Sequence, residues 1–272
     1  MPELPEVEIT RLGLLKHLKG RRCTGAVVRE TRFRKPTQKD LNTLISGQTL
    51  IDIDRRGKYL IWKFSDGSLF SHLGMSGTLT VLDPKIAHLR KHDHIDLIFG
   101  DRIARYHDPR RFGFLTWIGK TDPNSLPEIS KLGVEPLTSD LTGAYLKESF
   151  KNSERSIKEA LLDGTTVVGV GNIYCSESLF LAGINPKTKA GKISLERLNK
   201  LAEAIKKVLE KSLAEGGSTL KDFISAEGQQ GYFTLHANVY GKEGETCPRC
   251  KGKIKRIIQN GRSTFYCPKC QN

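Results

Sequence analysis

The first periodic stretch of the chain predicts a helix. Val7, Leu14 and Leu18 recur at helical spacing and place an apolar stripe on one side of this stretch. Pro5 suits the first turn of a helix, and Gly20 is a typical stop signal. We therefore expect a helix over residues 5–18.

From residue 23 to about residue 118 the pattern changes to short alternating runs that are typical of strands. Ile51 and Ile53 alternate with acidic residues, and the pair Asp66-Gly67 is a turn signal. Strand candidates follow at 58–64, 68–73, 78–82, 94–99, 103–106 and 112–117. This many short strands predict an antiparallel sandwich or barrel.

The second half of the chain returns to helical spacing after a stretch rich in proline. Residues 119–142 show little periodicity and are expected to form a linker. Residues 195–213 keep a helical apolar pattern behind Ser194, an N-cap residue, and Gly216-Gly217 ends that pattern. Residues 218–234 are polar and glycine-containing, which favours a loop.

The composition is that of a globular protein without a membrane segment. The chain has 272 residues, of which 38% are hydrophobic and 27% are charged. No run approaches the roughly 20 apolar residues that span a bilayer. The first residues contain neither the basic nor the apolar part of a signal peptide. These features argue against a secreted or membrane-spanning protein.

The charge of the chain points to a polyanionic partner. Lysine and arginine number 44 against 30 acidic residues, which gives a formal net charge of +14. The surplus is uneven, because residues 241–272 contain eight basic and two acidic residues. Nucleic acid is the commonest partner of so basic a chain.

Four of the six cysteines form a metal-binding pattern near the end of the chain. Cys247-x2-Cys250 and Cys267-x2-Cys270 are separated by 16 residues, which is the spacing of a four-thiolate zinc ribbon. Four protein ligands leave no open coordination position, so one structural Zn2+ is expected. The other two cysteines lie far apart, which does not resemble a disulfide framework and favours a reducing cytosol.

The 16-residue spacer between the cysteine pairs is long enough for a β-hairpin. Asn260-Gly261 is a turn dipeptide within it, so Arg262 is expected to project near the tip of the hairpin. In so basic a segment we expect this arginine to contact phosphate.

The N-terminus offers a second chemical signal. Removal of the initiator methionine, which is normal before a small residue, leaves Pro2 as a secondary amine. An α-amino group has a pKa near 7.7–8.0, so a useful fraction is neutral at pH 7 and can form a Schiff base with an electrophilic carbon. Glu3, Glu6 and Glu8 are close enough in sequence to act as acid or base. Proline is common at this position, so the pattern alone does not assign the chemistry.

A series of motifs along the whole chain resembles bacterial formamidopyrimidine-DNA glycosylases. The series begins with Met-Pro-Glu-Leu-Pro-Glu-Val-Glu at 1–8 and ends with the zinc ribbon. Between them stand Arg-Arg-Gly-Lys-Tyr-Leu at 55–60, His-Leu-Gly-Met-Ser-Gly at 72–77, Lys-His-Asp-His at 91–94, Asp-Pro-Arg-Arg-Phe-Gly at 108–113, Val-Gly-Asn-Ile-Tyr at 170–174 and Val-Tyr-Gly at 239–241. The motifs occur in the order of the family.

The resemblance implies an α+β multidomain fold. An N-terminal helix and an antiparallel β-sandwich form a catalytic domain, for which we expect residues 1–131, and a linker follows over 132–150. A helix–two-turn–helix DNA-binding domain with a base-capping loop is expected over 151–235, and a zinc-finger hairpin over 236–272.

The resemblance also implies four catalytic residues. Pro2 is the nucleophile at C1′ of the damaged nucleotide, and Glu3 is the acid and base for base loss and sugar-ring opening. Lys58 assists β-elimination, and Arg262 assists δ-elimination while it holds phosphate.

The remaining implied residues contact DNA. Met75, Arg110 and Phe112 match the residues that fill the space left by an extruded base, with Arg110 facing the orphaned cytosine. Further DNA contacts are expected from His72, His92, Arg155, Lys158, Asn172 and Tyr240.

The sequence therefore predicts a monomeric, cytoplasmic, bifunctional DNA glycosylase and abasic-site lyase. Its partner is double-stranded DNA that contains oxidised purines. An endonuclease VIII-like enzyme for oxidised pyrimidines and a non-catalytic zinc-ribbon DNA-binding protein remain as alternatives.

Overall fold

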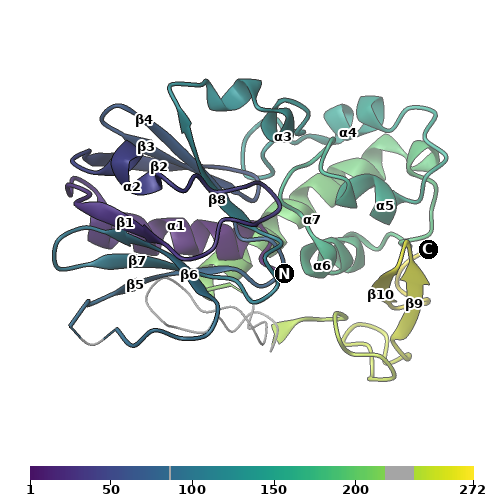
Figure 1. The fold of residues 1–272 in the computed structure, drawn as a ribbon. Helices are drawn as coiled ribbons and strands as arrows, with labels where there is room; N and C mark the ends of the chain where they lie inside the picture. Colours follow the sequence, from purple (N-terminus) through teal and green to yellow (C-terminus); the bar gives the residue numbers. More distant parts are fainter. Residues whose placement is uncertain (86, 218–235) are drawn as a thin grey trace. The chain divides into compact units, whose positions relative to one another are not determined.

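The computed structural model describes residues 1–85, 87–217 and 236–272. The chain forms two compact units (Figure 1). One is built around Met1–Ser130, and the other contains Lys131–Ala214 and the C-terminal residues 236–272. The finer four-part division expected from the sequence stays a prediction.

The first unit contains two antiparallel four-stranded sheets, which confirms the predicted α+β architecture with a β-sandwich. One sheet has the order β2-β3-β4-β8, and the other has the order β1-β6-β7-β5. The first sheet consists of β2 (Leu50–Arg56), β3 (Tyr59–Phe64), β4 (Gly67–His72) and β8 (Phe114–Gly119). The second consists of β1 (Gly25–Val28), β6 (Asp93–Ile98), β7 (Ile103–His107) and β5 (Thr78–Leu82).

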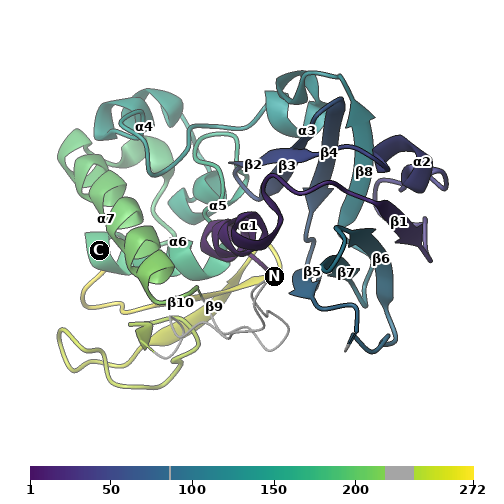
Figure 2. The same ribbon diagram turned by 90° about the vertical axis from the view of Figure 1, so that its left-hand side faces the viewer.

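Helix α1 (Leu4–Leu18) confirms the helix expected at the N-terminus. Its apolar stripe, including Leu14 and Leu18, is fully buried. The helix contacts β2 and β3 of one sheet and β5 of the other (Figure 2). Burial of this stripe fixes the start of the helix, and with it residues 2 and 3, on the sandwich.

The first unit also contains three short helical segments. Helix α2 (Leu41–Ile45) lies between β1 and β2, and the 3-10 turn η1 (Pro123–Ser125) and α3 (Pro127–Ser130) follow β8. The sequence pattern did not predict α2, because five residues are too short to show a helical period.

Two loops at the end of the sandwich, residues 73–77 and 108–113, approach each other so closely that only glycine fits. A Cβ on Gly74 would lie 2.3 Å from the backbone nitrogen of Gly113. A Cβ on Gly113 would lie 2.3 Å from both the carbonyl oxygen of His72 and the hydroxyl of Tyr106. The glycines of these motifs are therefore needed for packing between the loops.

The second unit is helical and carries the C-terminal hairpin. Its helices are α4 (Gly143–Ser149), α5 (Ile157–Leu162), α6 (Asn172–Ala182) and α7 (Leu195–Ala214), with the 3-10 turn η2 (Ala190–Lys192). The hairpin consists of β9 (Lys255–Gln259) and β10 (Arg262–Tyr266), and β10 contacts α6 (Figure 2). Among the helices that the structure describes, none is both long and apolar enough to cross a bilayer.

The sequences of α6 and α7 differ in how clearly their hydrophobic patterns predict a helix. Helix α7 has the amphipathic pattern predicted from residue 195 onward. In α6 every residue from Ile173 to Phe180 is buried, so no polar face is present to create a period. Helix α4 follows the aperiodic stretch 119–142 and lies within the linker expected over 132–150; at its start the hydroxyl of Thr142 accepts a hydrogen bond from the backbone of Tyr145 at 3.0 Å.

We expect Gly113→Ala to destabilise the first unit. The added methyl meets backbone on one side and the buried Tyr106 on the other, so relief requires the loops to separate, at a cost of about 2–4 kcal/mol. The measurement is the free energy of unfolding by urea. Gly100→Ala is the control, because Gly100 has φ +67° but open space around its Cβ position, so its cost is limited to about 1–2 kcal/mol of strain. Equal costs for the two variants would contradict the packing argument.

Candidate active site and nucleic-acid interface

The predicted nucleophile and its acid lie at the beginning of α1. Pro2 is buried, and Glu3, which is 2% exposed, is the residue before the first helical turn. Glu3 and Glu6 form a reciprocal capping box, in which the backbone N–H of Glu3 donates to Glu6 Oε2 at 2.8 Å. The carboxylate of Glu3 is thus held beside residue 2 and over backbone N–H groups of the first turn, which stabilise its negative charge.

An ion-pair cluster fastens α1 to the turn that carries Lys58. Arg55 Nε donates to Glu8 Oε2 at 2.8 Å, and the same guanidinium donates to the carbonyl of Gly57 at 3.0 Å. Burial raises the pKa of the Glu8 carboxyl, but hydrogen bonds from Arg11 and Arg55 outweigh it and hold this pKa below its usual value. Glu8 therefore stays ionised, and the turn before Lys58 stays attached to the helix that begins after Glu3.

His72, at the end of β4, is neutral. Burial, together with the cations of Lys58 and Arg34, lowers the pKa of His72 to about 4. The backbone N–H of Gly74 donates to its Nδ1 at 2.9 Å, which places the proton of the neutral ring on Nε2. His72 can therefore donate a hydrogen bond but contributes no charge to DNA binding.

Asp108 joins the two glycine-rich loops. Its buried carboxylate accepts hydrogen bonds from Ser76 Oγ at 2.9 Å, Tyr106 Oη at 3.1 Å and the backbone N–H of Gly113 at 2.9 Å. The backbone N–H of Arg110 donates to the same carboxylate at 3.3 Å. One side chain thus fixes both loops that carry the predicted void-filling residues.

These void-filling residues are exposed, as insertion into DNA requires. Met75 is 38% exposed and Phe112 is 46% exposed, although both are large and apolar. The guanidinium carbon of Arg110 lies 4.8 Å from the centroid of the Phe112 ring. Exposed apolar side chains next to a stacked guanidinium are suited to contact with bases.

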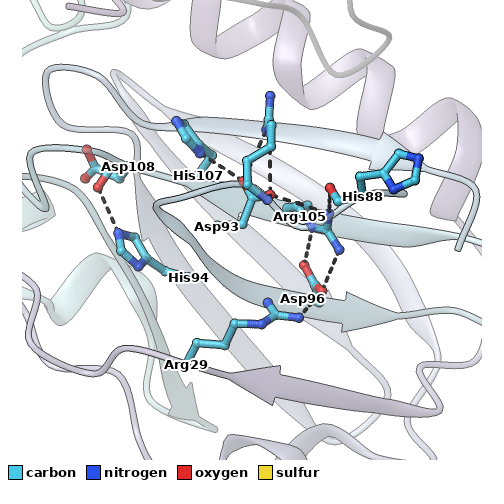
Figure 3. A network of polar contacts seen from close by, with 9 residues as sticks. Arg29, His88, Asp93, His94, Asp96, Arg105, His107 and Asp108 are labelled. Carbon is cyan, nitrogen blue, oxygen red and sulfur yellow. Dashed lines mark hydrogen bonds and ion pairs between the residues drawn. The ribbon is translucent and has the colours of Figure 1, made fainter. Parts of the chain in front are cut away.

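His92 lies directly before Asp93, which belongs to a polar network on the second sheet (Figure 3), and its ring centroid is 6.2 Å from that of His107. Arg105 binds Asp96 in a bidentate pair at 2.8 and 2.9 Å, and Asp93 accepts from His107 Nδ1 at 2.9 Å. His92 itself has φ +74°, in the left-handed region that non-glycine residues rarely adopt. The carbonyl of His92 accepts a hydrogen bond from the backbone N–H of Asp108 at 3.1 Å, and its contact with DNA stays a prediction.

The structure gives Lys158 and Asn172 an internal role. Lys158 is fully buried, and its ammonium donates to the carbonyl of Ser263 at 3.0 Å and to Thr264 Oγ1 at 2.6 Å. Asn172 Nδ2 donates to the same carbonyl at 2.9 Å. Both residues therefore hold the hairpin on α5 and α6. A direct phosphate contact of either residue stays a prediction.

Arg155 and Tyr240 are also held by neighbours. Arg155 pairs with Asp163 at 2.5 Å and is exposed. The backbone N–H of Tyr240 donates to Glu177 at 2.9 Å. Sequence reasoning missed Glu177, whose carboxylate also accepts hydrogen bonds from residues 238 and 239. The available signal was that Glu177 is the one charged residue of α6.

Arg262 lies where the turn signal placed it. Asn260 and Gly261 have φ of +49° and +71°, and Arg262 pairs with Gln259 at the start of the hairpin strands. Arg262 is exposed and lines a recess of the second unit together with Lys158 and Arg155. The hairpin prediction is confirmed, and the phosphate contact remains to be tested.

The four C-terminal cysteines fit a single tetrahedral ion. Their sulfur atoms all lie within 4.8 Å of one another, with Sγ–Sγ distances of 3.8 Å for Cys247–Cys270 and 3.5 Å for Cys250–Cys267. Four sulfurs at about 2.3 Å from zinc are about 3.8 Å apart. Two of the cysteines are buried in a small core with Phe180, Val239 and Ile254, so the ion has a structural role.

Family models match most of the chain. The N-terminal domain of formamidopyrimidine-DNA glycosylase matches residues 1–115, and the H2TH domain of that enzyme matches residues 132–224. A zinc finger found in FPG and IleRS matches residues 244–272. The cysteine cluster and this match establish one structural zinc ion.

Full-length relatives and solved structures agree with these matches. The chain is 49% identical over 272 residues to formamidopyrimidine-DNA glycosylase of Acidithiobacillus ferrooxidans, with 100% of both chains covered. It is 47% identical to that of Thioalkalivibrio sulfidiphilus, with the same coverage. The structure of a Lactococcus lactis Fpg mutant with DNA containing Fapy-dG has a TM-score of 0.92 at 35% identity and covers 100% of both chains. The MutM (Fpg) protein from Thermus thermophilus has a TM-score of 0.88 at 35% identity, covering 99% of this chain and 98% of that one.

Removal of zinc should unfold the hairpin and leave the first unit intact. The cysteine core and the bonds from Lys158 and Asn172 both require the hairpin to be formed, and four-thiolate sites supply folding free energy to small modules. With a strong chelator, amide exchange should lose its protection in residues 244–272 and keep it in 1–118. The affinity of the protein for duplex DNA should fall when the hairpin unfolds. Full affinity in the metal-free protein would contradict this prediction.

Proposed function

The chain belongs to the formamidopyrimidine-DNA glycosylase family, and we propose that Pro2 and Glu3 perform its chemistry. It is a base-excision-repair DNA glycosylase for oxidised bases, with abasic-site lyase activity. The observation that carries the site assignment is the placement of Pro2 and Glu3 at the buried N-terminal end of α1.

Pro2 acts as the nucleophile once Met1 has been removed. The proline nitrogen is then a secondary amine with a lone pair, whereas in a Met1–Pro2 peptide bond that lone pair is delocalised. The positive end of α1 disfavours a further positive charge on the amine, which keeps it nucleophilic. Attack on C1′ displaces the base and joins the sugar to Pro2 through a C–N single bond. When the bond from C1′ to the ring oxygen then breaks, the lone pair of the nitrogen converts this link to an iminium.

Glu3 moves the protons of this reaction. Its carboxylate is fixed by the capping box and lies one residue from the nucleophile. It protonates the ring oxygen of the sugar as the ring opens and later accepts protons as a base. The capping box also explains why a buried carboxylate is tolerated here, since backbone N–H groups compensate for its desolvation.

Lys58 and Arg262 complete the strand cleavage. The iminium acidifies the C2′ proton, after which the 3′ phosphate and then the 5′ phosphate can leave. Lys58, which Arg55 and Glu8 hold in position through Gly57, assists the first elimination. Arg262, exposed at the hairpin, binds phosphate and assists the second.

The substrate is an oxidised purine in duplex DNA, bound by a monomer in the bacterial cytosol. Met75 and Phe112 fill the space of the extruded base, and Arg110 contacts the base that remains. Further contacts with DNA are proposed for His72, His92, Arg155, Lys158, Asn172 and Tyr240. Lys158 and Asn172 also hold the hairpin through their hydrogen bonds to β10. The base-capping loop expected at 218–234 lies outside the described residues.

Blocking the amine of Pro2 should abolish covalent chemistry without abolishing DNA binding. A form with one extra residue before Pro2 carries an acylated nitrogen and should give no borohydride-trapped product on DNA with 8-oxoguanine. Pro2→Gly is the matched variant, because it keeps a primary amine and should retain weak trapping. The readout is the amount of covalent adduct per bound enzyme. Normal trapping by the extended form would show that a residue other than Pro2 is the nucleophile, and Lys58 would be the first residue to test.

Arg110→Ala should lose preference for cytosine opposite the lesion. The guanidinium offers five donors, which cytosine O2 and N3 accept, whereas adenine presents its amino group as a competing donor. A good bidentate contact discriminates by about 1–3 kcal/mol, or roughly 5–150-fold. Single-turnover excision from two duplexes that differ only in the opposite base measures this ratio. Cleavage of a preformed abasic site should be much less affected.

Arg111→Ala is the control for Arg110→Ala. Arg111 is paired with Glu30 at 2.8 Å, so its removal should leave the ratio near that of the wild type. A normal ratio in Arg110→Ala with a reduced ratio in Arg111→Ala would assign the recognition of the opposite base to Arg111.

A further inference from the structure

Glu30, which follows β1, binds two arginines at once. Its Oε1 accepts from the backbone N–H groups of Thr31 at 3.0 Å and Arg32 at 2.9 Å, and from Arg32 Nε at 2.9 Å. Its Oε2 accepts from Arg32 Nη2 at 3.0 Å and from Arg111 Nη1 at 2.8 Å. Because hydrogen bonds from Arg32 dominate its surroundings, the pKa of Glu30 lies far below its usual value, and the carboxylate is ionised at neutral pH.

The arginines around Glu30 are not equivalent. A recess of the first unit is lined by two phenylalanines and four arginines: Arg32, Phe33, Arg34, Arg110, Arg111 and Phe112. Glu30 forms ion pairs with Arg32 and Arg111. Arg110 instead stacks on Phe112 and forms no ion pair among the residues that the structure describes.

Arg111 could compete with Arg110 for contact with the base opposite the lesion. The two residues are adjacent, so their Cα atoms are about 3.8 Å apart, and both side chains present the same fork of donors. The backbone of Arg111 has φ +54°, and its N–H donates to the carbonyl of Asp108 at 3.3 Å. The two guanidinium groups have different partners, because that of Arg111 donates to Glu30 Oε2 at 2.8 Å and that of Arg110 lies 4.8 Å from the centroid of the Phe112 ring.

We propose that Glu30 is a specificity-determining positioning residue: it holds Arg111 away from the opposite base, so that Arg110 alone reads it. Glu30 touches no substrate and acts through Arg111. The proposal rests on the proposed function, because it assumes that Arg110 faces the base left behind by the extruded nucleotide.

A purely structural role does not account for this arrangement. Arg111 is 44% exposed in its side chain, and ion pairs at such positions contribute little to folding stability. Arg32 is 82% exposed, so the other partner of Glu30 is solvated too. Removing the carboxylate should therefore leave the fold intact and change chiefly which guanidinium is free.

The test is Glu30→Gln, alone and combined with Arg111→Ala. Glutamine keeps the size of the side chain and loses the charge that retains Arg111. We expect single-turnover excision to lose preference for cytosine over adenine by roughly 5–10-fold, at the lower end of the range that one base contact provides. The double variant should recover the wild-type ratio, because the competitor is gone. A merely structural role of Glu30 would not be rescued by a second deletion.

The matched control is Glu196→Gln on α7. Glu196 also pairs with a cation, Lys200, at 2.7 Å, so the variant makes the same change in net charge away from the recess. The ratio of excision opposite cytosine to excision opposite adenine should equal that of the wild type.

The outcomes separate this proposal from the proposed function. If the wild-type enzyme gives no borohydride-trapped adduct, the proposed function fails. If trapping is normal and Glu30→Gln keeps the wild-type ratio, the role of Glu30 is overturned. A reduced ratio that the double variant does not restore also overturns it, because Glu30 would then act through a residue other than Arg111.

Discussion

One buried carboxylate, that of Asp108, holds together the two loops that carry Met75 and Arg110. Asp108 accepts hydrogen bonds from a serine in one loop, from a tyrosine in the sheet and from two backbone N–H groups of its own loop. Its backbone carbonyl accepts a further bond from His94 Nε2 at 3.0 Å. All these partners of the carboxylate are donors, and its two oxygens accept from each of them. Because the glycines of both loops allow contact between backbones, Met75 and Arg110 are carried by a rigid platform.

A second constraint connects the nucleophile to the lysine. Helix α1 begins directly after Glu3, and Glu8 in its second turn binds Arg55, which binds the carbonyl of Gly57. The packing of α1 against both sheets therefore sets the position of Pro2 and the turn before Lys58 together. The groups proposed to act in one reaction are thus attached to one buried helix, which limits their relative motion.

Several of the basic residues bind groups of the protein itself. Lys158 is buried and holds the hairpin, and Arg105 is buried between carboxylates of the second sheet. Arg249 donates to the carbonyls at the end of α6 and stacks on Phe180. Net charge alone therefore indicates a polyanionic partner. The carboxylates and carbonyls around each basic side chain determine whether that side chain is available to bind the partner.

Local features of the sequence determined much of the structure and the site. The cysteine spacing predicted the zinc ribbon, Asn260-Gly261 predicted the hairpin turn, and the apolar periods predicted α1 and α7, because each depends on residues close in sequence. The motif series likewise indicated the family and the residues at the N-terminus. Only the tertiary structure decided the rest. Helix α6 is buried on every side and has no period, Lys158 points inward, and Arg111 is distinguished from Arg110 by Glu30, 81 residues earlier. These features depend on partners brought together by folding, which the local pattern around each residue does not contain.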